Sequence, residues 1–259
     1  MNIATTQDAI DRAIKFLRDI GHPVEADLII HADHKPVTMN TWSVSYWKPS
    51  WEIRFRSSTG VSVDESGTIS HFSLGARGSA EAPVSEMKPL TEAGARECAS
   101  AIIAAMRVPE EVKVEDLMAE LMQEAPFDNW WFTFHRTYEG MRCLHESFVV
   151  TVNAKTGRPS SARLNFHSFL PLSAETVISK EQAVATAERH LTAAGIKDFR
   201  YTGVNKYVVA PNDFLANTNL DRMCARVAWV CFFATANTLY VPYIDAQTGE
   251  ALGGDVQFQ

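Results

Sequence analysis

The chain has 259 residues, 46% of them hydrophobic, which is enough to bury the core of one large domain or of two or three small ones. Its formal net charge is -7 and it contains no basic run, so a surface that neutralises nucleic-acid phosphates is not expected. No uninterrupted apolar stretch approaches the roughly 20 residues of a membrane-spanning helix, which predicts a soluble protein.

The first predicted element is an amphipathic helix over residues 6–20. Thr5 or Thr6 is placed to cap it, apolar residues recur at helical spacing, and Gly21 is placed to end it. This pattern begins without the basic and apolar regions of a secretory signal. Two alternatives therefore stay open: the protein remains in the cytoplasm, or a leader has been removed.

Aromatic-rich segments at 42–46 and 51–56 follow, and apolar and polar residues alternate in both. This alternation predicts half-buried antiparallel strands. Downstream, Asp64 is placed to start a turn by bonding its side chain to the backbone, and Gly67 to supply a positive φ. A segment rich in small residues and proline, 75–89, is predicted to be a linker.

The same order of elements then returns with additions. A helix is predicted over 90–106, and a second amphipathic helix is inserted over 109–123. Strand patterns follow at 130–136 and 148–152. The sequence NAKTG then repeats the turn, with Asn153 and Gly157 in the positions of Asp64 and Gly67.

A third copy closes the chain. Ser179 and Gln182 have the spacing of a capping box at the start of a helix, strand patterns lie downstream, and DAQTG places Asp245 and Gly249 in the turn. The threefold order predicts an α+β protein of three tandem units, each with a helix packed on an antiparallel sheet. The predicted units are 1–74, 89–168 with the inserted helix, and 177–259.

Two stretches carry a resemblance to a known family. The third copy, with SKEQA and VPYIDAQTGEAL, resembles a PepSY domain, and FHRTYEGMRCLHESFVVTVNAKTG at 134–157 resembles the PepSY-related repeated domain of YcdB/YcdC-type bacterial proteins. The first copy departs from the pattern, because its turn lacks the Thr and its helix lacks the SxEQA start. The resemblance implies a cystatin-like fold, usually outside the cytoplasm, and in related propeptide domains peptidase inhibition or chaperoning. It implies no catalytic residues.

Two adjacent tryptophans give the strongest indication of a contact surface. Trp130 and Trp131 point to opposite faces of one strand, so one of them faces away from the helix and is available to a partner unless another repeat covers it. His135 and Tyr138 on the same strand complete the predicted binding residues. We therefore predict a non-catalytic protein-binding module without a cofactor, whose partner is a peptidase or a cell-envelope component.

The histidines support an alternative, a small-molecule or metal-binding module in a cleft between repeats that uses His135, His145 or His167. The HADH stretch at 31–34 is interpreted as part of a solvated loop with a turn at 32–36, and NDFLANTNLD at 212–221 as an Asn-rich connector, so no metal ligands are predicted. A hydrolase is a further alternative, although nucleophile, dinucleotide and phosphate-loop motifs are missing.

The four cysteines lack the CxxC spacing of a zinc or thioredoxin-type site. Free structural thiols are favoured and disulfides are the alternative. The cysteines are Cys98, Cys143, Cys224 and Cys231.

Overall fold

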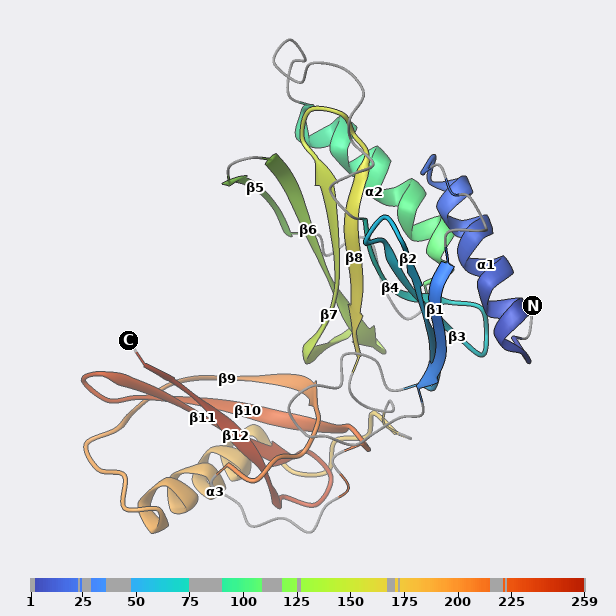
Figure 1. Ribbon diagram of the computed structural model, residues 1–259. Coiled ribbons are helices and arrows are strands. Elements are labelled where there is room, and N and C mark those ends of the chain that lie inside the picture. Colours follow the sequence, from blue (N-terminus) through green and yellow to red (C-terminus); the bar gives the residue numbers. More distant parts are fainter. Residues whose placement is uncertain are drawn as a thin grey trace. The chain divides into compact units, whose positions relative to one another are not determined.

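The computed structural model in Figure 1 describes residues 3–22, 24, 29–35, 48–74, 90–108, 118–124, 127–166, 171, 173–214, 221 and 223–258. Its helices are α1 (Thr6–Asp19), α2 (Glu92–Met106) and α3 (Lys180–Ala193). Its strands are β1 (Ile29–Lys35), β2 (Ser50–Phe55), β3 (Gly60–Asp64), β4 (Ile69–Ser73), β5 (Met118–Glu124), β6 (Phe127–Tyr138), β7 (Met141–Asn153), β8 (Pro159–Asn165), β9 (Arg200–Val209), β10 (Arg226–Ala234), β11 (Thr238–Asp245) and β12 (Ala251–Phe258). The strand predicted at 42–46 and the linker at 75–89 lie outside the described residues.

The twelve strands form one mixed sheet. Its order is β1-β2-β3-β4-β8-β7-β9-β10-β11-β12, and β6 pairs with both β5 and β7. The β7–β9 pair is parallel, with Cys143 opposite Val208. By contact density the chain divides into two compact units. The first unit comprises Met1–Arg136 and Ser147–Phe166, and the second comprises Thr137–Glu146 and His167–Gln259.

The prediction of three helix-on-sheet units is therefore wrong. In the first unit β4 pairs with β8, with His71 opposite Arg163 and Ser73 opposite Ser161, so the sheets of the first two predicted repeats are fused. Two unpaired edges would each have left a row of backbone N–H and C=O groups exposed, and their pairing removes both edges. Both α1 and α2 then lie on one face of the fused sheet (Figure 1) and share its core.

This shared core follows from strand alternation in register. One row of residues, one from each of six paired strands, faces the helices: Ala32, Ile53, Val61, Phe72, Ala162 and Val150. Phe16 of α1 packs on Phe72 with ring centroids 5.1 Å apart, and Ala99 and Ile102 of α2 are buried in the same core. Burial of large apolar side chains from both repeats in a single core stabilises the fusion.

A buried arginine also joins the two repeats. The side chain of Arg12 in α1 is 2% exposed, its Nε donates to the Gly67 carbonyl at 2.8 Å, and its Nη2 donates to the Ala105 carbonyl at 2.8 Å. Gly67 is in the β3–β4 turn and Ala105 is in the last turn of α2. One side chain therefore connects α1, the first Asp–Gly turn and α2.

The second unit carries α3 on the sheet of β9 to β12. Ala183, Ala187 and Leu191 of α3 are fully buried against strand residues that include Phe233 and Ile244. The opposite face of this sheet holds a second apolar cluster of Val209, Ala228, Val230, Val241, Tyr243 and Leu252.

Asn212 fastens the segment after β9 to the edge strand β12. Its Nδ2 donates to the Gly254 carbonyl at 2.9 Å, and its Oδ1 accepts from the Gly254 and Phe214 N–H groups at 3.0 Å each. Gly253 has a φ of +118°. A Cβ atom at Gly253 would overlap Asn212, so this approach requires glycine.

The three Asp/Asn–Gly turns share one hydrogen-bond pattern. The side-chain Oδ1 atoms of Asp64, Asn153 and Asp245 each accept from two backbone N–H groups of their own turn, at 2.7 to 3.1 Å. The glycines that donate back to these residues have φ values of +83°, +68° and +76°, in the order Gly67, Gly157 and Gly249. Each turn connects two neighbouring strands of the sheet.

Each turn is also bonded to the chain just before a helix. The N–H groups of Ile3, Leu90 and Ile178 donate to the carbonyls of Glu65, Ala154 and Ala246, at 2.8, 2.6 and 3.1 Å. The residues that precede α1, α2 and α3 are thus fixed to the hairpin on which each helix packs.

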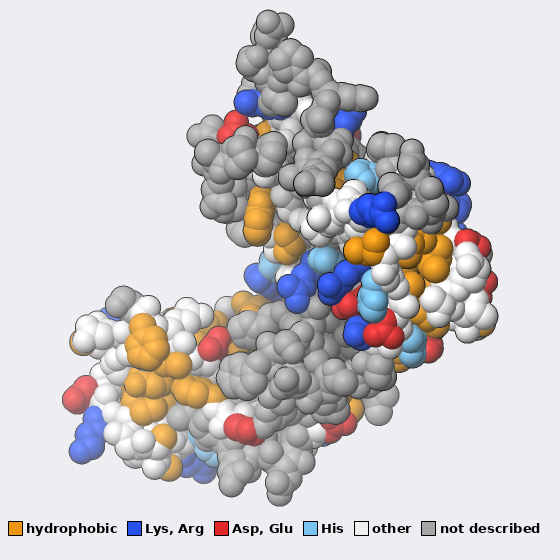
Figure 2. All heavy atoms as spheres, viewed as in Figure 1, with side chains coloured by type: hydrophobic (Ala, Val, Ile, Leu, Met, Phe, Trp, Pro, Cys, Tyr) orange, Lys and Arg blue, Asp and Glu red, His pale blue; other side chains and the backbone are white. Residues whose placement is uncertain are grey.

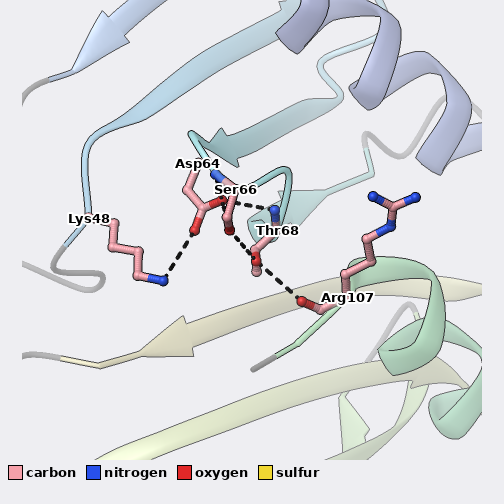
Figure 3. A network of polar contacts seen from close by, with 5 residues as sticks. All are labelled: Lys48, Asp64, Ser66, Thr68 and Arg107. Carbon is pink, nitrogen blue, oxygen red and sulfur yellow. Dashed lines mark hydrogen bonds and ion pairs between the residues drawn. The ribbon is translucent and has the colours of Figure 1, made fainter. Parts of the chain in front are cut away.

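Figure 3 shows the first of these turns. The buried carboxylate of Asp64 accepts from the Ser66 hydroxyl at 2.6 Å and lies 4.0 Å from the Lys48 Nζ. The Thr68 hydroxyl donates to the carbonyl of Arg107, the left-handed C-cap of α2, at 3.2 Å. The turn therefore also holds the C-terminal end of α2.

The helix predicted over 109–123 is wrong where the structure describes it. Met118–Glu124 is strand β5, paired antiparallel with β6 from Met118 opposite Thr133 to Glu124 opposite Phe127. The apolar residues of this segment are compatible with the spacing of a helix and with that of a strand. The edge of β6 offers backbone hydrogen-bond partners, and sequence spacing does not reveal such partners.

The predicted capping box at Ser179 is confirmed. The Ser179 hydroxyl accepts from the Gln182 N–H at 3.2 Å, and the Gln182 side chain accepts from the Ser179 N–H at 2.8 Å. Ser179→Ala should lower the free energy of unfolding by about 1 kcal/mol, whereas Ser179→Asp should keep most of it. Urea unfolding followed by circular dichroism measures both variants, and an Ala variant as stable as the parent would contradict this role of the box.

All four cysteines are free. Cys143 and Cys231 are buried, and burial raises the pKa of the Cys231 thiol to about 12. No helix in the described ranges is long and apolar enough to cross a membrane.

Candidate functional site

The candidate site is the face of the first unit's sheet opposite α1 and α2. Residues adjacent to the core row point to this face, because successive side chains of a strand alternate. One row across it is formed by Asp33, Glu52, Ser62, His71, Arg163 and Val149, and the next by His31, Arg54, Gly60, Ser73, Ser161 and Thr151. These two rows, together with Trp131, are here named the helix-free face.

Trp131 is the exposed aromatic side chain of the helix-free face. It is 41% exposed, whereas Phe132 and Phe134 on the alternate positions of β6 are fully buried. Trp130 points to the helix side, where its Nε1 donates to the Leu90 carbonyl at 3.2 Å and its ring stacks on Phe132. The expectation that one of the two rings faces away from the helix is confirmed, and that ring belongs to Trp131.

Two cations on or beside this face are held by carboxylates. The Lys35 Nζ lies 2.9 Å from the Asp33 Oδ2, and the Arg54 Nη2 lies 3.7 Å from the Glu52 Oε2. The Arg163 side chain is exposed, and within the part of the chain that the structure describes no carboxylate lies within ion-pair distance of it. In the space-filling view of Figure 2, Lys, Arg and His side chains gather over the strands of the first unit.

His71 lies directly opposite Arg163 on the neighbouring strand and is partly buried. Burial lowers the pKa of the His71 imidazole, and the positive charge of Arg163 lowers it further, whereas Glu52 acts weakly in the opposite sense. The ring is therefore neutral at pH 7. A neutral imidazole can donate one hydrogen bond without bringing a second charge to the site.

The other predicted binding residues do not all join this face. His135 is partly buried on β6, two alternations from Trp131 on the same side of the strand. Tyr138 belongs to the second unit, where it packs against a cluster that contains Cys143, Val208 and Val227. Tyr138 is therefore left out of the site.

Two of the three histidines of the alternative ligand site lie on paired strands, His135 on β6 and His145 on β7. His167 lies outside the described residues. The turn predicted at 32–36 is wrong where the structure describes it: residues 32–35 belong to β1, and the His34 ring packs on Trp51 with centroids 4.5 Å apart. Among the residues that the structure describes, no group of three His, Cys, Asp or Glu side chains is placed to hold a metal ion.

Arg163 and His71 were missed by sequence reasoning. Alternation in β8 would have found Arg163, because Ala162, Leu164 and Phe166 are buried and the residues between them face the other way. The position of His71 beside Arg163 required knowledge that β4 pairs with β8.

Comparisons with solved structures give only distant likenesses. No protein-family model matches the sequence, and no curated protein matches it. The solved structure of the Bacillus megaterium YpeB C-terminal domain is similar with a TM-score of 0.44 and 15% sequence identity, covering 100% of both chains.

Proposed function

We propose that this protein is a non-catalytic binding protein that holds a protein partner against the helix-free face, with Trp131 as the anchor. The observation that carries the proposal is the exposure of 41% of a tryptophan side chain in the middle of a β-strand. Tryptophan is among the residues that contribute most to binding free energy at protein interfaces, because it buries a large area and keeps one polar group.

The side chains around Trp131 are of the kinds found at the rim of protein–protein interfaces. Apart from Val149 and Gly60, the rest of the helix-free face carries charged, hydroxyl and imidazole side chains, and a polar surround of this kind is typical of the rim of a protein interface. The face is built on paired strands whose other side is a packed core, so the backbone that carries its side chains is held in place. Binding a partner would therefore cost little in ordering this surface.

The partner class follows from the sequence resemblance. PepSY-like domains imply a peptidase or a component of the cell envelope, and the absence of known catalytic motifs in the sequence favours binding over catalysis.

Trp131→Ala tests it directly. The full chain, immobilised, is incubated with a lysate and an envelope fraction of the source organism, and captured proteins are identified and quantified by mass spectrometry. We expect a partner captured in stoichiometric amount by the parent chain and about tenfold less by the variant, because the loss of an aromatic anchor costs more than about 1.4 kcal/mol.

Tyr201→Ala is the matched control. Tyr201 is 40% exposed and belongs to the second unit, so its removal deletes a comparable ring outside the helix-free face. Circular dichroism checks that both variants are folded. Equal capture by Trp131→Ala and the parent, or no stoichiometric partner at all, would refute the proposed function.

A further inference from the structure

The helix-free face contains a cation whose position suggests a ligand. Arg163 lies in β8, a strand with a neighbour on each side, so its side chain rises from the interior of the sheet. His71 is opposite it on β4 and Val149 is opposite it on β7. Neither neighbour carries a negative charge, and the same holds for Ser161 and Asn165 on its own strand.

The carboxylates of this face are remote from Arg163. Glu52 lies in the same row, but Ser62 and His71 stand between them, and three strand spacings amount to roughly 14 Å. Glu52 is moreover 3.7 Å from Arg54, and Asp33 at the end of the row is 2.9 Å from Lys35. The charges of these two acids are thus matched by their own neighbours.

Residues with hydrogen-bonding side chains occupy sheet positions next to Arg163. Ser161 precedes it by two residues on β8, and Ser73 lies opposite Ser161 on β4. The Asn165 side chain donates a hydrogen bond to the Ser147 hydroxyl at 3.3 Å, so these two residues bond to each other and are not counted in the subsite. Two serine hydroxyls and a neutral imidazole beside an arginine that has no carboxylate partner among the described residues form a set of donors that matches an oxyanion.

We infer that Arg163 and its neighbours His71, Ser73 and Ser161 form a carboxylate subsite, which takes an Asp or Glu side chain from an acidic segment of the protein partner. This inference rests on the proposed function and adds the chemistry of the partner. A guanidinium binds a carboxylate through two parallel hydrogen bonds, which gives direction as well as charge recognition. Trp131 supplies the apolar anchor and Arg163 the charge selection on one face.

The net charge of the chain allows an acidic peptide to be used as a specific probe of this subsite. At -7 the protein does not attract acidic peptides in general, so binding of one reports on a local site. The probe is a blocked tetraglutamate peptide, and a blocked tetraglutamine peptide of the same length is its neutral match. Both are titrated at constant ionic strength into the full chain labelled with nitrogen-15, and backbone amide shifts are recorded by NMR.

We expect saturable shifts of amides in β4 and β8 with tetraglutamate and none with tetraglutamine. Arg163→Gln should weaken the apparent affinity about tenfold, the loss of one charged bidentate contact. Arg18→Gln is the control, because Arg18 is an exposed cation on α1, which packs on the opposite face of the sheet. Shifts that are equal for the two peptides, unchanged in Arg163→Gln, or absent would each overturn the subsite.

The two proposals fail separately. If tetraglutamate does not bind but partner capture depends on Trp131, the carboxylate subsite is wrong and the binding face stands. If tetraglutamate binds at Arg163 but no partner depends on Trp131, the subsite stands and the proposed function is wrong.

Discussion

Gly253→Ala is expected to lower the free energy of unfolding by about 3 kcal/mol, because a left-handed backbone position is strained by a Cβ atom and the Asn212 hydrogen bonds are lost as well. The φ of Gly253 is +118°, and its missing Cβ is the space into which the Asn212 side chain and carbonyl fit. Urea unfolding followed by circular dichroism measures the change.

Gly203→Ala is the control for this experiment. Gly203 lies in β9 of the same unit and has no positive φ, and a Cβ atom added there would meet no other atom within 4 Å. The substitution should therefore change stability by less than about 0.5 kcal/mol. If Gly253→Ala were as mild as Gly203→Ala, the fastening of β12 by Asn212 would not contribute to stability.

Arg12→Met is the second substitution with a large expected effect. Methionine keeps the apolar length of the side chain but leaves the carbonyls of Gly67 and Ala105 without their donor. We expect a loss of about 3 kcal/mol, because both lost bonds come from a charged donor and the acceptors stay largely buried. Thermal and urea unfolding of the full chain give the value.

Arg18→Met separates this effect from a simple loss of charge. Arg18 lies on the exposed side of α1, in its last turn, so its removal should cost only a few tenths of a kcal/mol. A similar loss of stability in both variants would show that the buried bonds of Arg12 are unimportant.

Local features of the fold could be predicted from the sequence because their causes are local. A capping residue such as Ser179 bonds within one helical turn, and a turn residue such as Asp245 bonds to the next few N–H groups. The opposite orientations of Trp130 and Trp131 follow from strand geometry alone. These inferences required no knowledge of any distant segment.

The remaining features depend on partners far along the chain. The pairing of β4 with β8 and of β5 with β6 is a choice of sheet edge, which residue spacing does not encode. The fusion of two predicted repeats, the buried role of Arg12 and the position of His71 beside Arg163 all follow from that choice. Sequence reasoning named Trp130 and Trp131 together, whereas the position of His71 beside Arg163 could not be inferred without the β4–β8 pairing.

The division of β6 and β7 between the two compact units determines how the protein can be dissected. Residues 137–146 at the tip of this hairpin belong to the second unit, although the chain on both sides of them belongs to the first. No single cut in the gene can therefore yield two complete halves. A fragment that starts at residue 177 would lack Tyr138 and Cys143, and the apolar side chains of Val208 and Val227 that pack against them would be exposed to water. Truncation experiments should keep this hairpin with both halves, or use the intact chain.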